Sequence, residues 1–159
     1  MVALELARTT GRVASLTLIG TALSGDGYDP EPMFAAPSDA DGLRESLEAA
    51  LSREFVDAQP DVISQIVEWR AAEDADAVSW ERQAAALDGF AIEKPYEITE
   101  PTLVVHGTDD RLCPVARGRE LAADLPKAEL FEVEGAGHLA HVEASKVVND
   151  RLQTFLGPT

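Results

Sequence analysis

Two apolar runs near the end of this chain each stop at a turn that presents a reactive side chain. Residues 101–106 lead into a glycine turn that carries Asp110, and residues 128–133 lead through Gly135-Ala-Gly137 to His138. Each run has the pattern of a strand, and the glycines mark where it ends. Functional groups of open α/β sheets gather beyond the carboxyl ends of the strands. We therefore expect Asp110 and His138 to meet at one edge of a sheet, within about 2.6–3.2 Å of each other.

Strand-like and helix-like patterns alternate over the rest of the chain. This alternation predicts an α/β fold with parallel strands and right-handed crossovers. In order, we expect a helix at about 2–10, a strand at Arg12–Ile19, a loop from Gly20 to Pro37, helices from Ser38 to about Leu87, a strand at Thr102–His106, a helix at about Val115–Leu125, a strand at Ala128–Val133 and a helix at about Ala144–Leu156.

The helical stretch in the middle is predicted to hold three helices. Leu43 to Phe55 repeats apolar residues every fourth position, a second stripe covers residues 62–70 behind Pro60, and a third helix runs from about Asp74 to Leu87. Aromatic residues here could contact an apolar substrate, although a core role suits their spacing equally well. These aromatics are Trp69, Trp80 and Phe90.

Taken together, these features resemble the C-terminal half of an α/β-hydrolase. The family pattern G-x-x-D-x-x-x-P matches Gly107, Asp110 and Pro114, and G-x-G-H matches the segment from Gly135 to His138, in the family's order of acid before histidine. Residues 1–8 resemble the helix that follows the family's nucleophile. The resemblance implies three parts: 1–24 as core helix and strand, 25–95 as a helical cap insertion over the active site, and 96–159 as the C-terminal core.

By the same resemblance, Asp110 is the acid and His138 the base of a catalytic triad, with no cofactor or metal. The implied activity is hydrolysis of a small carboxylic ester or lactone, although the family also includes thioester, C–C bond and epoxide cleavage and haloperoxidation. The chain contains no G-x-S-x-G nucleophile motif. The resemblance puts the nucleophile about four residues upstream of Met1, so the chain alone is expected to be inactive. The alternative is a non-catalytic fragment or interaction module.

Other residues compete for these roles. Asp110 could simply close an Asx turn, and Asp109 is a second candidate acid. His106 lies inside a predicted strand and is expected to be a hydrogen-bonded core residue. His141 lies one helical turn after His138, a metal-like spacing without a third ligand, so a place at the pocket rim or a cap on the last helix is preferred to zinc. Cys113 is expected to be a small buried residue.

The strand predicted at Arg12–Ile19 would lie at the edge of the sheet. In the resembled fold, this strand pairs on one side with the strand that carries the nucleophile. Its open edge, with Val13, Leu16 and Leu18 beside it, predicts pairing with a second copy or a partner chain.

Composition narrows the possible partners and habitat. The chain has 29 acidic and 13 basic residues and a net charge of -16, which makes nucleic acid an improbable ligand. No apolar run approaches the roughly 18 residues of a membrane span, and no signal peptide is visible, which predicts a cytoplasmic protein. The acid-rich balance, with three lysines (Lys94, Lys127, Lys146), resembles that of proteins from salt-loving archaea, with an ordinary acidic bacterial enzyme as the alternative.

Overall fold

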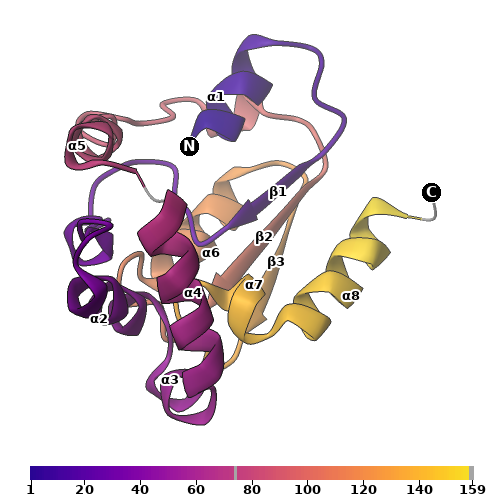
Figure 1. The fold of residues 1–159 in the computed structure, drawn as a ribbon. Coiled ribbons are helices and arrows are strands. Elements are labelled where there is room, and N and C mark those ends of the chain that lie inside the picture. The colour runs from indigo at the N-terminus through magenta and orange to yellow at the C-terminus, as the bar shows by residue number, and fades with distance from the viewer. Residues whose placement is uncertain (74, 158–159) are drawn as a thin grey trace.

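A three-stranded parallel sheet forms the centre of the molecule. The computed structural model describes residues 1–73 and 75–157. The strands β1 (Leu16–Ile19), β2 (Thr102–Gly107) and β3 (Ala128–Val133) lie in the order β1-β2-β3, with Leu16 opposite Thr102 and Thr102 opposite Ala128. All three carboxyl ends therefore face the same way (Figure 1). This arrangement confirms the predicted α/β architecture with parallel strands.

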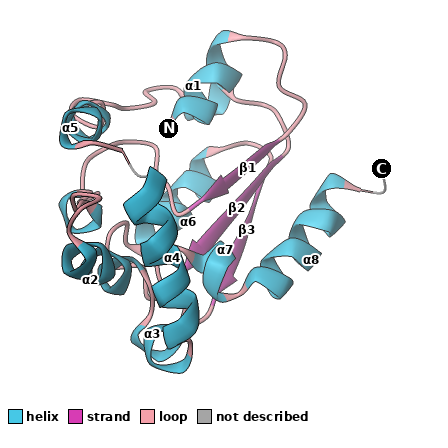
Figure 2. Ribbon diagram, viewed as in Figure 1, coloured by secondary structure: helices cyan, strands magenta, loops and turns pink. Residues whose placement is uncertain are grey.

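Helices cover both faces of the sheet (Figure 2). On one face, α1 (Val2–Thr9) and α6 (Val115–Asp124) pack against Leu18 and Val104; on the other, α7 (Ala140–Glu143) and α8 (Ser145–Leu156) pack against Leu103 and Val105. Neighbouring residues of β2 point to opposite faces, and every residue of β2 is buried. Burial on both faces is typical of a central parallel strand.

The predicted start of the first strand is wrong. The first strand begins at Leu16 rather than at Arg12. The hydrogen bond from Leu16 N–H to the carbonyl of Pro101, the residue before β2, starts the pairing with β2 (2.9 Å). The predicted last helix at about Ala144–Leu156 is confirmed as α8 (Ser145–Leu156); the short helix α7 precedes it, and the backbone of Ala144 between the two departs from helical geometry (φ -117°, ψ 42°). The predicted helix 2–10 and strand Ala128–Val133 are confirmed.

Residues 25–95, which lie within the long connection from β1 to β2, are called the helical insertion. It contains the 3₁₀ turn η1 (Glu31–Met33) and the helices α2 (Ala40–Ala50), α3 (Arg53–Ala58), α4 (Pro60–Glu73) and α5 (Ala77–Ala85), and a second 3₁₀ turn, η2 (Pro95–Glu97), bounds it. Helices α2, α3 and α4 lie near the carboxyl ends of the strands (Figure 1). The predicted helix start at Asp74 lies outside the described residues.

The apolar stripe from Leu43 to Phe55 belongs to two helices instead of one. Leu51 is extended (φ -106°, ψ 160°), and the Ser52 side chain accepts a hydrogen bond from Phe55 N–H, so a new helix begins there. Leu51 and Ile63 are nevertheless buried in one cluster, and Leu139, the residue after His138, packs against this cluster. The insertion is thus joined to the chain segment that carries His138.

Strand β1 has one free side. It pairs with β2 only, so within the described residues the opposite edge has no strand beside it. A cavity of about 410 Å³ lies along this strand and continues past Gly20 to Tyr28 and Cys113. The apolar side chains Val2 and Leu6 of α1 are also exposed, at 85% and 51%.

Candidate active site

Asp110 is held in a tight turn directly after β2. Its Oδ1 accepts hydrogen bonds from the backbone N–H groups of Leu112 (3.0 Å) and Cys113 (2.8 Å). The side chain is buried, and its second oxygen, Oδ2, remains for other partners. The Asx turn considered as an alternative is therefore real, and it fixes the carboxylate without using both of its oxygens.

His138 approaches that second oxygen from the turn after β3. Its Nδ1 lies 2.8 Å from Asp110 Oδ2, within the predicted range. Gly135 has a positive φ of 71°, and its N–H donates to Thr108 Oγ1 (2.8 Å), which ties the histidine turn to the acid turn. The two turns therefore meet at the carboxyl edge of the sheet, as the sequence predicted. Asp109, the second candidate acid, is exposed, and its carboxylate lies near the Thr108 hydroxyl.

A second histidine shares the same carboxylate. His106 on β2 is completely buried, and its Nε2 lies 2.7 Å from the Cys113 carbonyl and 3.2 Å from Asp110 Oδ2. Its Nδ1 has no hydrogen-bond partner among the described residues. The core position predicted for His106 is confirmed, but its contact with Asp110 could not be predicted from the strand pattern.

The two histidines keep Asp110 ionised. Burial alone raises the pKa of Asp110, but the hydrogen bonds from His106 and His138 outweigh it and hold the pKa well below its usual range. Burial likewise lowers the pKa of His106, and the contacts with Asp110 and Cys113 reverse this and raise it above its ordinary value. A carboxylate that stays charged can orient an imidazole and stabilise its protonated form.

Tyr28 faces the other nitrogen of His138. Its hydroxyl lies 3.4 Å from His138 Nε2, and the two ring centroids are 5.5 Å apart. Burial, and to a smaller extent the nearby Cys113 and Asp110, raise the pKa of Tyr28 to about 12, so the phenol stays protonated and can donate. With Nδ1–H donating to Asp110, Nε2 is free to accept from Tyr28. Tyr28 lies in the glycine- and proline-rich loop, where no sequence signal marks it.

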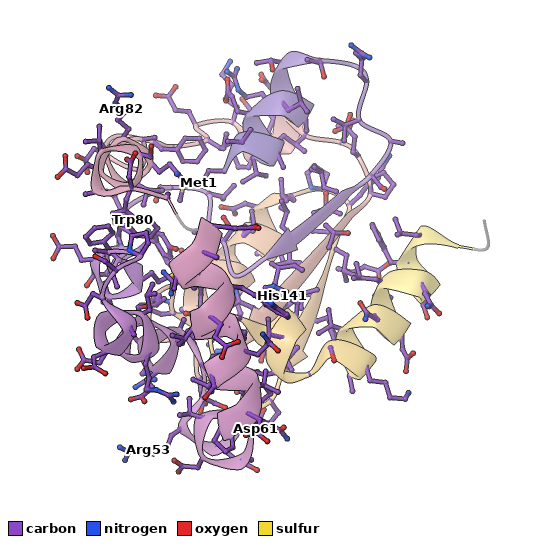
Figure 3. The ribbon with its side chains drawn as sticks, in the orientation of Figure 1. Met1, Arg53, Asp61, Trp80, Arg82 and His141 are labelled. Carbon is purple, nitrogen blue, oxygen red and sulfur yellow. The ribbon has the colours of Figure 1, made fainter. Side chains whose placement is uncertain are left out.

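A large open cavity adjoins Tyr28. It has a volume of about 780 Å³ and is lined by the stacked pair Phe34 and Trp80, whose ring centroids are 5.7 Å apart. Figure 3 shows Trp80 on the insertion, away from Arg53 and Asp61. Trp69 is 64% exposed, and Phe90 packs against the main core. Of the three aromatics singled out in the sequence, only Trp80 lines this cavity.

The remaining candidates lie outside this arrangement. Cys113 is buried, as predicted, and its backbone N–H and carbonyl contact Asp110 and His106, respectively. His141 lies on α7 (Figure 3) and is largely exposed; the partial burial of its ring and, to a smaller extent, the nearby His138 lower its pKa. Among the described residues, no group of three or more His, Cys, Asp and Glu side chains could hold a metal ion. None of the described helices is both long and apolar enough to cross a membrane.

Comparison with known proteins agrees with this fold. A 2-hydroxy-6-oxononadienedioate/2-hydroxy-6-oxononatrienedioate hydrolase from Cupriavidus pinatubonensis is 43% identical over 61 residues, which are 38% of this chain and 21% of that protein. The structure of an α/β-hydrolase from a Medee basin deep-sea metagenome matches with a TM-score of 0.79 at 18% identity. The enol-lactonase from Burkholderia xenovorans LB400 matches with a TM-score of 0.78 at 24% identity.

These structural matches cover nearly all of this chain but only part of the other proteins. The alignments span 99% and 96% of this chain, and 62% and 60% of the deep-sea hydrolase and the enol-lactonase, respectively. The chain thus corresponds to about three-fifths of each solved relative. The model of the α/β-hydrolase family matches residues 1–151, which include the Asp110 and His138 turns. On this match over almost its whole length, the chain belongs to the α/β-hydrolase family.

Proposed function

We propose that Asp110 and His138 are the acid and base of a hydrolase site that acts on a small carboxylic ester or lactone. The observation that carries this proposal is the 2.8 Å contact between Asp110 Oδ2 and His138 Nδ1, which leaves Nε2, on the side of the Tyr28 hydroxyl, to act as the base. In acyl transfer, such an imidazole takes the proton of the nucleophile and then gives a proton to the leaving group. The lactone choice draws support from the enol-lactonase among the structural relatives.

The nucleophile is proposed to come from a polypeptide segment that pairs with the free edge of β1. A parallel strand added there would lie about 4.8 Å from β1 and end beside Gly20. Gly20 is next to the imidazole, because a Cβ placed on it would lie 3.1 Å from His138 Nδ1 and Cε1. A side chain at the end of the added strand is therefore close to His138. In this arrangement, Tyr28 lies at the nucleophile's side of the ring and can donate to a substrate oxygen.

The helical insertion is proposed to act as a cap over the site. Its helices α2–α4 lie near the carboxyl ends of the strands, and the cavity lined by Phe34 and Trp80 opens beside Tyr28. A cavity of this size accepts a small organic acyl or alcohol group.

The coding sequence upstream of Met1 provides the first test. An in-frame G-x-S-x-G segment preceded by strand patterns is expected, and the extended protein should hydrolyse p-nitrophenyl esters or an enol lactone, with activity lost in the His138→Ala variant. If the extended protein is well folded and carries this segment but the His138→Ala variant keeps full activity, the proposed base is wrong.

The alternative, a non-catalytic interaction module, predicts a different result. The 159-residue chain has no nucleophile motif, so a fluorophosphonate probe is expected to leave it unlabelled in either case. Stoichiometric labelling of one of its own serines would contradict both readings. An upstream sequence without a nucleophile, together with a partner captured through β1, would favour the interaction module.

A further inference from the structure

We propose that Glu143 is a positioning residue that fastens the helical insertion to the turn carrying His138. The place of attachment is the insertion corner, defined as residues 48–52, where α2 ends and α3 begins. The effect of Glu143 on catalysis rests on the function proposed above for His138. The attachment itself is tested without any catalytic measurement.

The Glu143 carboxylate bridges the two segments with both of its oxygens. Oε1 accepts a hydrogen bond from Gly137 N–H (2.7 Å), one residue before His138. Oε2 accepts from Ser52 N–H (3.1 Å) and from the Ser52 hydroxyl. Hydrogen bonds to a charged acceptor are stronger than neutral ones, so this single side chain binds the histidine turn to the insertion corner.

Backbone contacts strengthen the same junction. The carbonyl of Ala50, at the end of α2, accepts from His138 N–H (2.8 Å) and from Leu139 N–H (3.3 Å). Carbonyls at a helix end lack partners inside the helix, and here the histidine turn provides them. Gly137 comes so close that a Cβ on it would lie 2.7 Å from the Ala50 oxygen. The position of the His138 backbone is thus defined by the insertion as well as by β3.

The acid turn is attached to the same corner. Arg111, which follows Asp110, donates through Nη2 to the carbonyls of Glu48 (2.6 Å) and Leu51 (3.0 Å). A guanidinium at the end of a helix also interacts favourably with the helix dipole. Since the corner contacts both turns, it can hold Asp110 and His138 at a fixed separation. Replacing Glu143 removes its contacts with both segments and leaves the Arg111 contacts of the acid turn in place.

The test is solution NMR of the chain with Glu143→Ala and Glu143→Gln. In the wild type, ¹⁵N shifts should show His138 as a single tautomer with Nδ1 protonated. In Glu143→Ala, we expect a mixture of tautomers and hydrogen exchange of the Gly137 and Ser52 amides at least about tenfold faster, because both amides lose a charged acceptor. Glu143→Gln keeps the side-chain volume but can accept from only one of the two amides, so exchange should accelerate at the other.

Glu132→Ala is the matched control. The Glu132 carboxylate also accepts hydrogen bonds with both of its oxygens, here from Arg119, but it lies on β3 away from the insertion corner. This variant should leave the His138 tautomer and the Gly137 exchange rate unchanged. The proposal is overturned if folded Glu143→Ala and Glu143→Gln both behave like the wild type, or if Glu132→Ala changes His138 equally. If His138 later proves not to be catalytic, these NMR results still decide whether Glu143 positions it.

Discussion

Replacing the two glycines of the His138 turn one at a time should separate two physical reasons for glycine. At Gly137 the reason is space, because an added Cβ would lie 2.7 Å from the Ala50 oxygen, 2.9 Å from the Leu51 carbonyl carbon and 3.0 Å from the Ser52 nitrogen. All three are backbone atoms and cannot rotate away. At Gly135 the reason is conformation, because φ is 71° while nothing lies within 4 Å of an added Cβ.

The magnitudes follow from these two causes. Overpacking at Gly137→Ala costs about 1–3 kcal/mol, which the reduced entropy of the unfolded chain offsets by about 0.4–1 kcal/mol. We therefore expect a net loss of about 1–2 kcal/mol in the free energy of unfolding. The left-handed backbone at Gly135→Ala costs about 1–2 kcal/mol before the same offset, so a loss of about 0.5–1 kcal/mol is expected.

Gly11→Ala is the control. Gly11 has no positive φ and nothing within 4 Å of an added Cβ, so alanine there should stabilise the protein by about 0.4–1 kcal/mol. Urea unfolding followed by circular dichroism measures all three variants. The reasoning is refuted if Gly137→Ala is as stable as the wild type, or if Gly11→Ala destabilises as much as Gly137→Ala does.

Three further predictions concern pH, salt and assembly. Folding lowers the pKa of Asp110, so its ionised carboxylate stabilises the protein at pH values above about 3.9, the pKa of an unfolded aspartate, and this stabilisation is lost as the pH falls below that value. The urea midpoint should therefore decrease less steeply with falling pH in Asp110→Asn than in the wild type. If the charge of -16 reflects a high-salt habitat, the melting temperature should rise between low salt and about 2 M KCl, and a flat or falling curve would contradict that origin. Light scattering at about 10 µM should show species larger than a monomer, because one edge of β1 has no strand beside it in the described part of the chain, whereas a monodisperse monomer with fast-exchanging β1 amides would show that the edge is tolerated.

Local sequence patterns predicted the sheet and the meeting of the two turns. Strand β3 has the predicted bounds, and β2 extends one residue further, to Gly107. Strand β2 could be recognised because a central parallel strand is largely apolar, and both strands could be placed because glycine or proline bounds them. Once both strands are parallel neighbours, the turns after them must lie at one edge, and the contact between Asp110 and His138 follows from topology.

Contacts between segments distant in the sequence could not be predicted from those patterns. Tyr28 reaches His138 from an irregular loop, and Glu143 reaches Ser52 across the junction between the sheet and the insertion. A four-residue apolar repeat also continues across the break at Ser52, because Leu51 remains buried although α2 has ended. Periodicity reports which side chains are buried, whereas a helix end is decided by a local cap.

The tautomer of His138 tests the central claim most directly. If Asp110 and His138 are the acid and base of a hydrolase site, Nδ1 carries the proton that bonds to Asp110 Oδ2, and Nε2 is unprotonated and available as a base. Nitrogen-15 NMR of the histidine side chains near neutral pH should show this tautomer in the wild type, with a hydrogen-bonded Nδ1 proton that disappears in Asp110→Asn. A wild-type spectrum in which neutral His138 carries its proton on Nε2, unchanged by Asp110→Asn, would contradict the account.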